Sequence, residues 1–342
     1  MTSRPLADLL LDWYADHARA LPWRVPPGGE RPENHAYRVW LSEVMLQQTT
    51  VAAVRPRWEA WVARWPSVDD LAAASDEDIM AAWAGLGYYA RARNLVKAAR
   101  TIAERGAFPR TEAGLRELPG LGDYTAAAIA AIAFGEDAVP VDANVERVLA
   151  RLFAGDEPLP KARKAIRAHA ATIWPEGRAG DFVQAVMDLG ATICTSRGPK
   201  CLLCPIREHC SAYNTGEPER YPVKPPKKAR PERRGTAFWI ERGDAVWLVR
   251  RPEKGMMGGM RALPDDGWTA RSDGSGEAPL DGEWDDTGAV VHGFTHTTLT
   301  LAVKRYRGET EPLGEGEWWP LDQLDEAGLP TLFKKAAGRA TA

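Results

Sequence analysis

The first two thirds of the chain carry a helical pattern of apolar and polar positions. From residue 5 to residue 212 one helical run follows another across short breaks, and alternating strand-type patterns are nearly absent. Ser75 begins one helix in a capping-box-like arrangement with Asp78, Gly85 and Gly87 end it, and the next helix is predicted from about residue 88 to 106. The pattern predicts an all-α domain over residues 1–215.

A different pattern begins after residue 215. Residues 216–235 hold five prolines and seven basic residues, a composition that favours neither a helix nor a central strand, so we expect a connector. The acidic, Gly-rich stretch 265–286 is predicted as a loop. Short β-rich runs, separated by Gly, Pro and Asp, lie at 236–240, 245–250, 289–294 and 297–306. Residues 236–342 are therefore predicted as a smaller α+β domain.

Charged residues are distributed unevenly along the chain, which the net charge does not show. The 342 residues suffice for two globular domains, and their net charge of −3 gives no sign of a nucleic-acid partner. Residues 151–234, however, carry sixteen basic and nine acidic side chains, whereas the segments on either side are acidic. The basic block fits either a DNA-contacting surface or a solvated linker face.

The chain has no sequence feature of a membrane or secreted protein. No apolar run approaches the ~20 residues that a membrane span needs. Residues 1–12 include Asp8 and Asp12 where a signal peptide would be basic and then apolar. We therefore expect a cytoplasmic protein without membrane attachment.

All four cysteines lie close together, with the spacing C-x6-C-x2-C-x5-C. They are Cys194, Cys201, Cys204 and Cys210. In a reducing compartment this cluster favours a metal site over disulfides. Zinc and an iron–sulfur cluster both accept four thiolates, but one tight pair flanked by longer arms is more typical of the larger cluster. The metal could also serve only to clamp the loop, presenting Arg197, Lys200 and Arg207 to phosphates.

Residues 118–126, Leu-Pro-Gly-Leu-Gly-Asp-Tyr-Thr-Ala, link two predicted helices, the second of which runs to Phe134. Gly120 and Gly122 permit close approach of another chain, and amides at the start of the second helix attract an anion. This arrangement suits a DNA phosphate. A plain helix–helix turn has a similar sequence, so the motif alone leaves both interpretations open.

Two acids stand in contrasting surroundings. Asp142 precedes a helical run, where it is expected to cap the helix and stay ionised. Glu43 is the single acid in the apolar helix 39–46, where desolvation is expected to raise its pKa until it holds a proton near neutrality. Taken alone, each has an ordinary interpretation, as an N-cap and as a surface glutamate. Together, one protonated acid and one carboxylate suit cleavage of a glycosidic bond.

Seven motifs occur in an order that resembles the adenine DNA glycosylases of the MutY type, within the helix-hairpin-helix glycosylase superfamily. They are Leu21–Arg24, Ser42–Thr49, Gly85–Leu95, the 118–126 hairpin, the Asp142 segment, Met187–Ala191 and the four cysteines. The resemblance covers nearly the whole chain. It implies a monofunctional glycosylase that removes adenine opposite 8-oxoguanine or guanine in double-stranded DNA and leaves an abasic site. It also implies a [4Fe-4S] cluster on the cysteines, a monomer and a Nudix-like second domain.

The resemblance further implies residue roles. Glu43 would protonate N7 of a flipped-out adenine, and Asp142 would stabilise the sugar cation. Asn144 would orient the water or Asp142, and Tyr124 would lie at the pocket. Gln48 and Tyr88 would enter the base stack, with a capped helix end and a core aromatic as their alternative interpretations. The other implied DNA contacts are Thr49, Leu86, Gly120, Gly122, Phe294, Thr295 and His296. Trp23, Arg24 and Asp188 would hold the adenine, with ordinary packing as an alternative for Trp23.

Other sequence features weigh against competing functions. Tyr124 occupies the position where lyase relatives such as endonuclease III place a Schiff-base lysine, so a glycosylase-lyase for oxidised pyrimidines is disfavoured. An iron–sulfur electron-transfer or sensor protein would leave Glu43, Asp142 and the hairpin unexplained.

The second domain also departs from its presumed relatives. Residues 255–260 and 293–296 are its best Nudix-like markers, but the residues after Leu263 lack the Glu-rich helix of a Nudix hydrolase, so we expect binding without hydrolysis. Thr295 stands where the family's Phe-Ser-His loop has Ser. In the first domain, Asp123, Ala143 and a long segment at 25–36 also depart from the family pattern.

Overall fold

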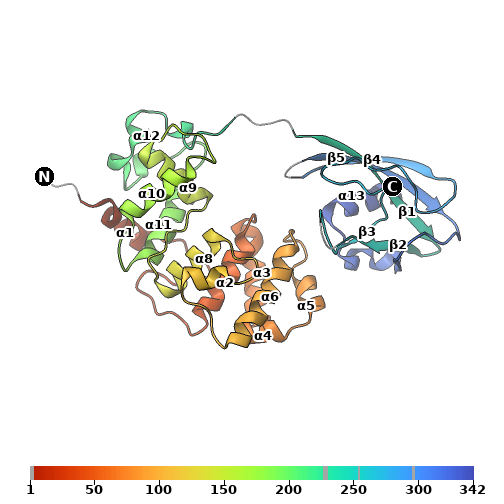
Figure 1. Cartoon of the computed structure of the whole chain (residues 1–342), viewed down its shortest axis with the longest axis horizontal. Coiled ribbons are helices and arrows are strands. Elements are labelled where there is room, and N and C mark those ends of the chain that lie inside the picture. Colours follow the sequence, from red (N-terminus) through yellow and green to blue (C-terminus); the bar gives the residue numbers. More distant parts are fainter. Residues whose placement is uncertain (1–3, 226–229, 253–254, 295–296) are drawn as a thin grey trace. The chain divides into compact units, whose positions relative to one another are not determined.

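The computed structural model describes residues 4–225, 230–252, 255–294 and 297–342. The chain divides into two compact units, Met1–Ala82 with Arg91–Pro226 and Trp83–Ala90 with Lys227–Ala342. Figure 1 shows helices throughout the first and a sheet in the second. Within the described ranges, no helix has both the length and the apolar character needed to cross a membrane.

The first unit is helical, as its pattern predicts. Its helices are α1 (Leu6–His17), α2 (His35–Leu46), α3 (Val51–Arg64), α4 (Val68–Ala73), α5 (Asp76–Ala82), α6 (Ala90–Arg105), α7 (Glu112–Arg116), α8 (Asp123–Ile129), α9 (Ala143–Phe153), α10 (Arg163–Ile173), α11 (Ala179–Thr192) and α12 (Ser211–Asn214). A π-helical turn, η1 (Ala130–Phe134), continues α8, and short 3₁₀ turns occur at Cys201–Leu203, Arg207–His209 and Pro218–Arg220.

Several helix starts follow directly from local sequence. The Ser75 hydroxyl accepts a hydrogen bond from the Asp78 amide (3.1 Å) at the start of α5, which confirms the predicted cap. The predicted 88–106 helix is α6. The second helix of the hairpin is only partly α-helical, because its last five residues form η1, which helical periodicity does not distinguish from an α-helix.

Helix α11 is the centre of the first unit. Eleven of the twelve residues from Ala179 to Gly190 are buried, with Asp181 as the exception, and α11 packs against α1, α9 and η1. Gly180 allows the closest of these contacts, since a Cβ atom there would lie 2.5 Å from the Ala131 carbonyl oxygen of η1. A glycine in the first turn of α11 therefore lets α11 and η1 approach backbone to backbone.

The second unit is a mixed sheet covered by a helix, the α+β arrangement that its sequence predicts. Its strands are β1 (Glu232–Arg242), β2 (Ala245–Arg250), β3 (Arg261–Ala262), β4 (Asp285–Gly293), β5 (Thr298–Arg307) and β6 (Glu317–Pro320). The order is β3-β2-β1-β5-β4, with β6 also paired to β2; among the strands described, β1 and β5 pair in parallel and the other pairs are antiparallel. β1 begins four residues before the predicted strand, within the proline-rich segment.

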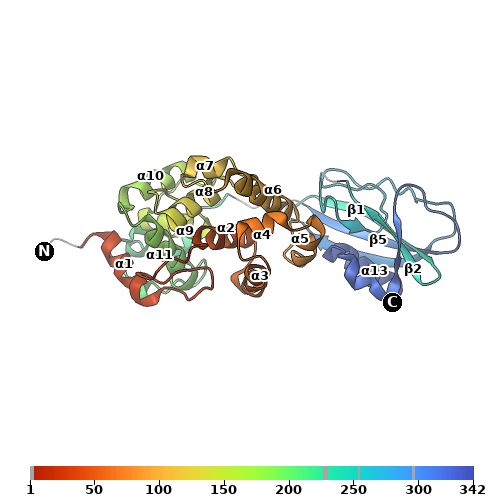
Figure 2. The same ribbon diagram turned by 90° about the horizontal axis from the view of Figure 1, so that it is seen from below.

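Helix α13 (Thr331–Thr341) lies along one face of this sheet, as Figure 2 shows. Its Leu332, Phe333 and Ala336 pack with Trp239 and Leu301 from the two parallel strands. A short 3₁₀ segment, Leu321–Ala327, precedes it. The two smallest strands, β3 and β6, are absent from the prediction because runs of two and four residues carry too little alternation to be recognised.

Candidate active site

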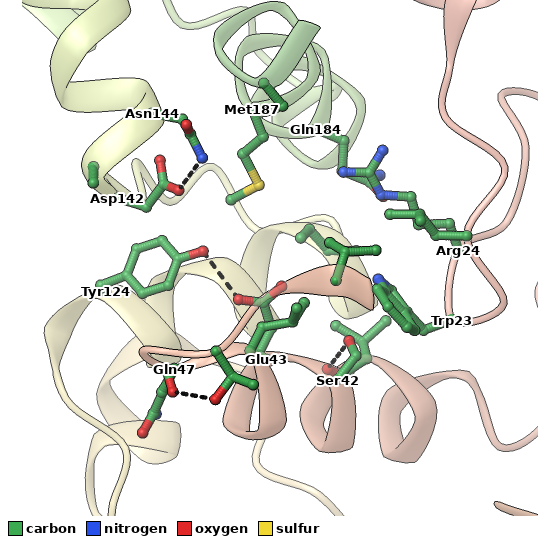
Figure 3. Close-up of a pocket in the computed structure, with 18 of the residues that line it drawn as sticks. Trp23, Arg24, Ser42, Glu43, Gln47, Tyr124, Asp142, Asn144, Gln184 and Met187 are labelled. Atoms are coloured by element: carbon green, nitrogen blue, oxygen red, sulfur yellow. Dashed lines mark hydrogen bonds between the residues drawn. The ribbon is translucent and has the colours of Figure 1, made fainter. Parts of the chain in front are cut away.

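A cavity of about 620 Å³ opens in the first unit, where α2, α3, α8, η1, α9 and α11 meet the loop before α2. Figure 3 shows Glu43 and Tyr124 facing Asp142 and Asn144 across it. The lining residues are Arg19, Leu21, Trp23, Arg24, Val39, Ser42, Glu43, Leu46, Gln47, Gln48, Thr49, Val51, Tyr124, Ile132, Val141, Asp142, Ala143, Asn144, Gln184, Met187 and Ala191. The structure thus brings together the four predicted catalytic residues, which lie up to about a hundred positions apart in the sequence.

Glu43 is buried, as its apolar helix predicts, and only 9% of the residue is exposed. Burial raises its pKa from 4.5 to about 7, because the charged form loses its hydration. The Tyr124 hydroxyl donates a hydrogen bond to Glu43 Oε2 at 3.0 Å, which opposes the rise, whereas the negative charge of Asp142 adds to it. Near neutral pH this side chain holds a proton about half of the time.

Asp142 caps α9, and its carboxylate is fixed at both oxygens. Oδ1 accepts from the Val145 amide at 2.7 Å and Oδ2 accepts from Asn144 Nδ2 at 3.1 Å. The sequence predicts that these bonds hold the carboxyl ionised, but its pKa is raised rather than lowered, because burial outweighs the hydrogen bonds. The two facing acids therefore share a desolvated cavity in which burial raises the pKa of both.

Tyr124 lies on α8, where the hairpin aims its ring into the cavity. Burial raises its pKa well above the ordinary value, and the neighbouring Glu43 and Asp142 charges raise it further, so the phenol stays neutral. A neutral phenol donates a hydrogen bond but forms no imine with a sugar. Among the described residues that line the cavity, none is a lysine.

Asp188 does not line the cavity, although the resemblance implies a role in holding adenine. It is completely buried behind the cavity wall, where it accepts from Arg24 Nη1 (2.7 Å), Arg19 Nε (2.5 Å) and the Arg19 amide (2.9 Å). Arg24 and Trp23 do line the cavity, and Trp23 also packs edge-on against Trp58. Asp188 therefore orients an arginine that faces the cavity instead of facing it directly.

Gln48 and Thr49 form the turn between α2 and α3 and line the cavity rim. Gln48 is exposed and has a φ of +55°, a left-handed conformation that is strained for a residue other than glycine. Tyr88 also has a positive φ, +48°, and is 53% exposed, so it is not the core aromatic of the alternative interpretation. Leu86 is buried, and neither it nor Tyr88 lines the cavity.

The hairpin between α7 and α8 has the turn geometry that its two glycines suggest. Gly120 has a φ of +81°, and Gly122, which precedes α8, has open space where a Cβ would lie. Asp123, the unusual residue, forms an exposed ion pair with Arg116 Nη2 at 2.8 Å. Part of its negative charge is thereby offset within the hairpin itself.

The four cysteines line one small cavity of about 30 Å³ beneath the loop 194–210. Arg151, which is 2% exposed, ties this loop to α9 by donating to the Thr195 carbonyl at 2.7 Å and to Cys194 Sγ at 3.3 Å. Burial raises the pKa of Cys204 to about 12, and the other thiols add to the rise. Within the part of the chain that is described, no three His, Cys, Asp or Glu side chains are arranged to hold a single metal ion.

In the second unit, only Phe294 of the predicted recognition loop can be placed. Its ring lies 6.0 Å from that of Trp268 and 4.7 Å from that of His292, measured between centroids. Thr295 and His296 lie outside the described residues, and the roles predicted for them stay predictions.

Many cavity residues carry no assignment from the sequence, among them three that come from the central helix and from η1. Gln184 and Met187 project from α11, and Ile132 comes from η1. Met187 lies in one of the seven motifs, which was the only available signal. Gln184 and Ile132 look like ordinary core positions, because their exposure to the cavity depends on how α11 and η1 pack.

A buried pair of acids beside a helical hairpin defines a glycosylase of the helix-hairpin-helix class, and residues 41–176 match the model of the HhH-GPD superfamily base excision DNA repair proteins. Residues 236–338 match the NUDIX domain. The chain is a DNA-binding N-glycosylase that hydrolyses N-glycosyl bonds, and it belongs to the adenine DNA glycosylase family.

Full-length relatives support this assignment. The adenine DNA glycosylase of Homo sapiens is 34% identical over 95% of this chain and 72% of its own length. That of Buchnera aphidicola subsp. Schizaphis graminum is 30% identical over 98% of both chains. Among solved structures, a thermostable thymine-DNA glycosylase matches 61% of this chain and 95% of its own, with 31% identity and a TM-score of 0.54.

Proposed function

We propose that this protein acts as a monomer that removes adenine mispaired with 8-oxoguanine or guanine in duplex DNA and leaves an abasic site. One observation carries the proposal: Glu43, with a pKa of about 7, faces Asp142 across a single cavity that one chain forms by itself. Cleavage of an N-glycosyl bond needs one group that gives a proton and another that offsets positive charge. An adenine flipped out of the duplex would reach both.

Glu43 would act as the general acid. Protonation at N7 turns the adenine into a neutral leaving group, and a carboxylic acid with a pKa near the working pH is best suited to give that proton. Tyr124, which is hydrogen-bonded to Glu43 Oε2, would hold the carboxyl group in place and keep it accessible. Trp23 and Arg24 would contact the extruded base from the cavity wall.

Asp142 would stabilise the sugar cation that forms as the bond breaks. Its two oxygens are already held by Val145 and Asn144, so little reorganisation is needed when positive charge develops nearby. Asn144 would also orient the water that finally adds to the sugar. Because Tyr124 offers no amine, the strand would stay intact at the resulting abasic site.

Cys194, Cys201, Cys204 and Cys210 would hold a [4Fe-4S] cluster. A single zinc ion requires four ligands at about 2.3 Å, whereas these thiols surround a cavity without converging on one point. This arrangement fits the larger cluster. When bound, the cluster supplies a four-point attachment of the 194–210 loop, and the protein side chains carry out the reaction at the sugar.

DNA contacts would be divided between the predicted domains. In the domain 1–215, Gln48 and Tyr88 would enter the stack, Thr49 and Leu86 would also contact the DNA, and the Gly120–Gly122 hairpin would bind a phosphate. The connector 216–235 would lead to the Nudix-like domain 236–342. There, Phe294, Thr295 and His296 would read 8-oxoguanine.

Excision from defined duplexes tests the proposal. The protein would be incubated with adenine opposite 8-oxoguanine, adenine opposite guanine, or thymine glycol opposite adenine, with and without alkali. We expect both adenines to be removed, thymine glycol to remain, and strand breaks to appear only after alkali. Removal of thymine glycol with spontaneous strand breakage would instead indicate a glycosylase-lyase.

A second arm tests the opposite-base assignment in the full-length chain. Thr295→Ala removes a hydroxyl whose hydrogen bond would be worth roughly 1 to 3 kcal/mol, or about five- to a hundredfold in preference. We expect a lower 8-oxoguanine-over-guanine preference with little change in excision opposite guanine. An unchanged ratio would place recognition of the opposite base elsewhere, most directly at Leu86 and Tyr88.

A further inference from the structure

The turn that would enter the DNA is conformationally costly. Gln48 is exposed and has a left-handed backbone conformation, which is strained for a residue other than glycine. The turn also follows the C-terminus of α2, where the last carbonyl groups have no partner within the helix. Some other part of the chain must stabilise both features.

Arg91, on the first turn of α6, supplies these bonds. It is 8% exposed and donates from Nη1 to the carbonyl oxygens of Val44 (3.2 Å), Met45 (3.0 Å) and Gln47, while Nη2 donates to Thr49 Oγ1 at 3.1 Å. One guanidinium group thus bonds to the residues immediately before and after Gln48. Only arginine carries enough donors in a rigid plane to make these contacts together.

The same helix supports the hairpin. Asn94 lies one turn beyond Arg91, and a Cβ atom on Gly120 would come within 2.7 Å of the Asn94 Cβ. Residues three positions apart share a helix face. The first turns of α6 therefore contact both segments that would meet DNA, the Gln48 turn and the hairpin.

We propose that Arg91 is a positioning residue: it holds Gln48 in the conformation that enters the base stack, and α6 is the common support of the two DNA-contacting turns. This inference rests on the proposed function, because it concerns extrusion of the adenine. Arg91 does not line the cavity and touches no reacting atom. Its effect is expected on base extrusion and not on proton transfer.

The test compares Arg91→Lys with Arg100→Lys. Arg100 serves as the control, since it lies on the same helix and also donates to carbonyl groups, those of Ala72 and Ala74, although it is more exposed than Arg91. Extrusion is followed with a duplex that carries 2-aminopurine beside the target adenine, whose fluorescence rises on unstacking. We expect Arg91→Lys to lose at least threefold in fluorescence rise and tenfold in single-turnover excision, with an unchanged pH profile. Equal behaviour of the two variants would overturn the proposal.

Gln48→Gly provides the decisive background. Glycine adopts the left-handed conformation without strain and has no side chain to insert. If Arg91 acts by positioning Gln48, it therefore has no side chain left to position in this variant. In this background we expect Arg91→Lys to cost less than threefold in excision. A further tenfold loss there would show that Arg91 supports the fold in general, and would overturn the proposal.

Hydrogen exchange separates this inference from the proposed function. In the DNA-free protein, the amides of Gln47 and Thr49, which donate to the Val44 and Leu46 carbonyls, should exchange at least tenfold faster in Arg91→Lys than in Arg100→Lys. If the unmodified protein excised no adenine, the proposed function would be wrong. The exchange rates would still show whether Arg91 stabilises the Gln48 turn. Equal exchange rates in the two variants would show that Arg91 does not stabilise the Gln48 turn.

Discussion

Replacing Glu43 by glutamine should impair catalysis and strengthen the fold at the same time. A carboxyl group with the ordinary pKa of 4.5 is protonated only about 0.3% of the time at pH 7, whereas one with a pKa of about 7 is protonated about half of the time. Burial therefore raises the protonated fraction of Glu43 at pH 7 about a hundredfold. Glu43→Gln removes the acid, and we expect excision to fall by at least ~10²-fold.

The stability gain follows from the same pKa. Because the folded-state pKa lies above the unfolded-state value, the folded protein binds more protons between pH 4.5 and 7, and its stability decreases as the pH rises through that window. The decrease amounts to about 3 kcal/mol. Glutamine does not titrate, so the variant should not lose this stability as the pH rises. The difference in free energy of unfolding between the variant and the parent protein should therefore be larger at pH 8 than at pH 4.5 by up to this amount.

Two measurements check the prediction. Urea unfolding of both proteins at pH 5 and pH 8 gives the difference in stability, in which the titrating groups that do not interact with Glu43 cancel. The dependence of kcat/KM on pH should show an upper limb near pH 7 in the parent protein. Glu146→Gln is a suitable control, because Glu146 lies on α9 but pairs with Arg163. Threefold or smaller loss of excision in Glu43→Gln, or a stability difference independent of pH, would refute the reasoning.

Three further outcomes are expected. Asp188→Asn should lower the free energy of unfolding by about 3 kcal/mol in urea, because it leaves Arg19 and Arg24 without their buried carboxylate; a loss below 1 kcal/mol would contradict this. Cys204→Ser should abolish bound iron and visible absorption, and stoichiometric zinc in a colourless parent protein would instead indicate a different metal. Borohydride should trap no covalent adduct with DNA, since Tyr124 is no imine-forming group; a good yield of adduct would count against it.

The buried acid was predictable because its cause is local. Glu43 is surrounded in sequence by apolar residues at helical spacing, and such a helix has no polar face on which to expose it. The capping role of Asp142 was equally local, but the direction of its pKa was not. That direction depends on how deeply α9 is packed, and packing depth outweighs two hydrogen bonds that the sequence already suggests.

Contacts across helices explain what sequence reasoning missed. Arg91 is one of several arginines near the start of α6, and only the packing of α6 against α2 selects it as the partner of the Gln48 turn. Asp188 occurs within a matching motif, yet the tertiary structure places it behind Arg24. A motif identifies residues that matter, whereas the fold decides whether each one faces the substrate or supports a neighbour.

The contact between Gly180 and η1 makes the size of the cavity adjustable from a distance. Ile132 lines the cavity from the π-helical turn, and the Ala131 carbonyl beside it rests against the bare Cα of Gly180. A methyl group at position 180 cannot fit without displacing that backbone, so Gly180→Ala would move the cavity wall without touching the base. The position of this part of the cavity wall therefore depends on a residue that does not itself line the cavity.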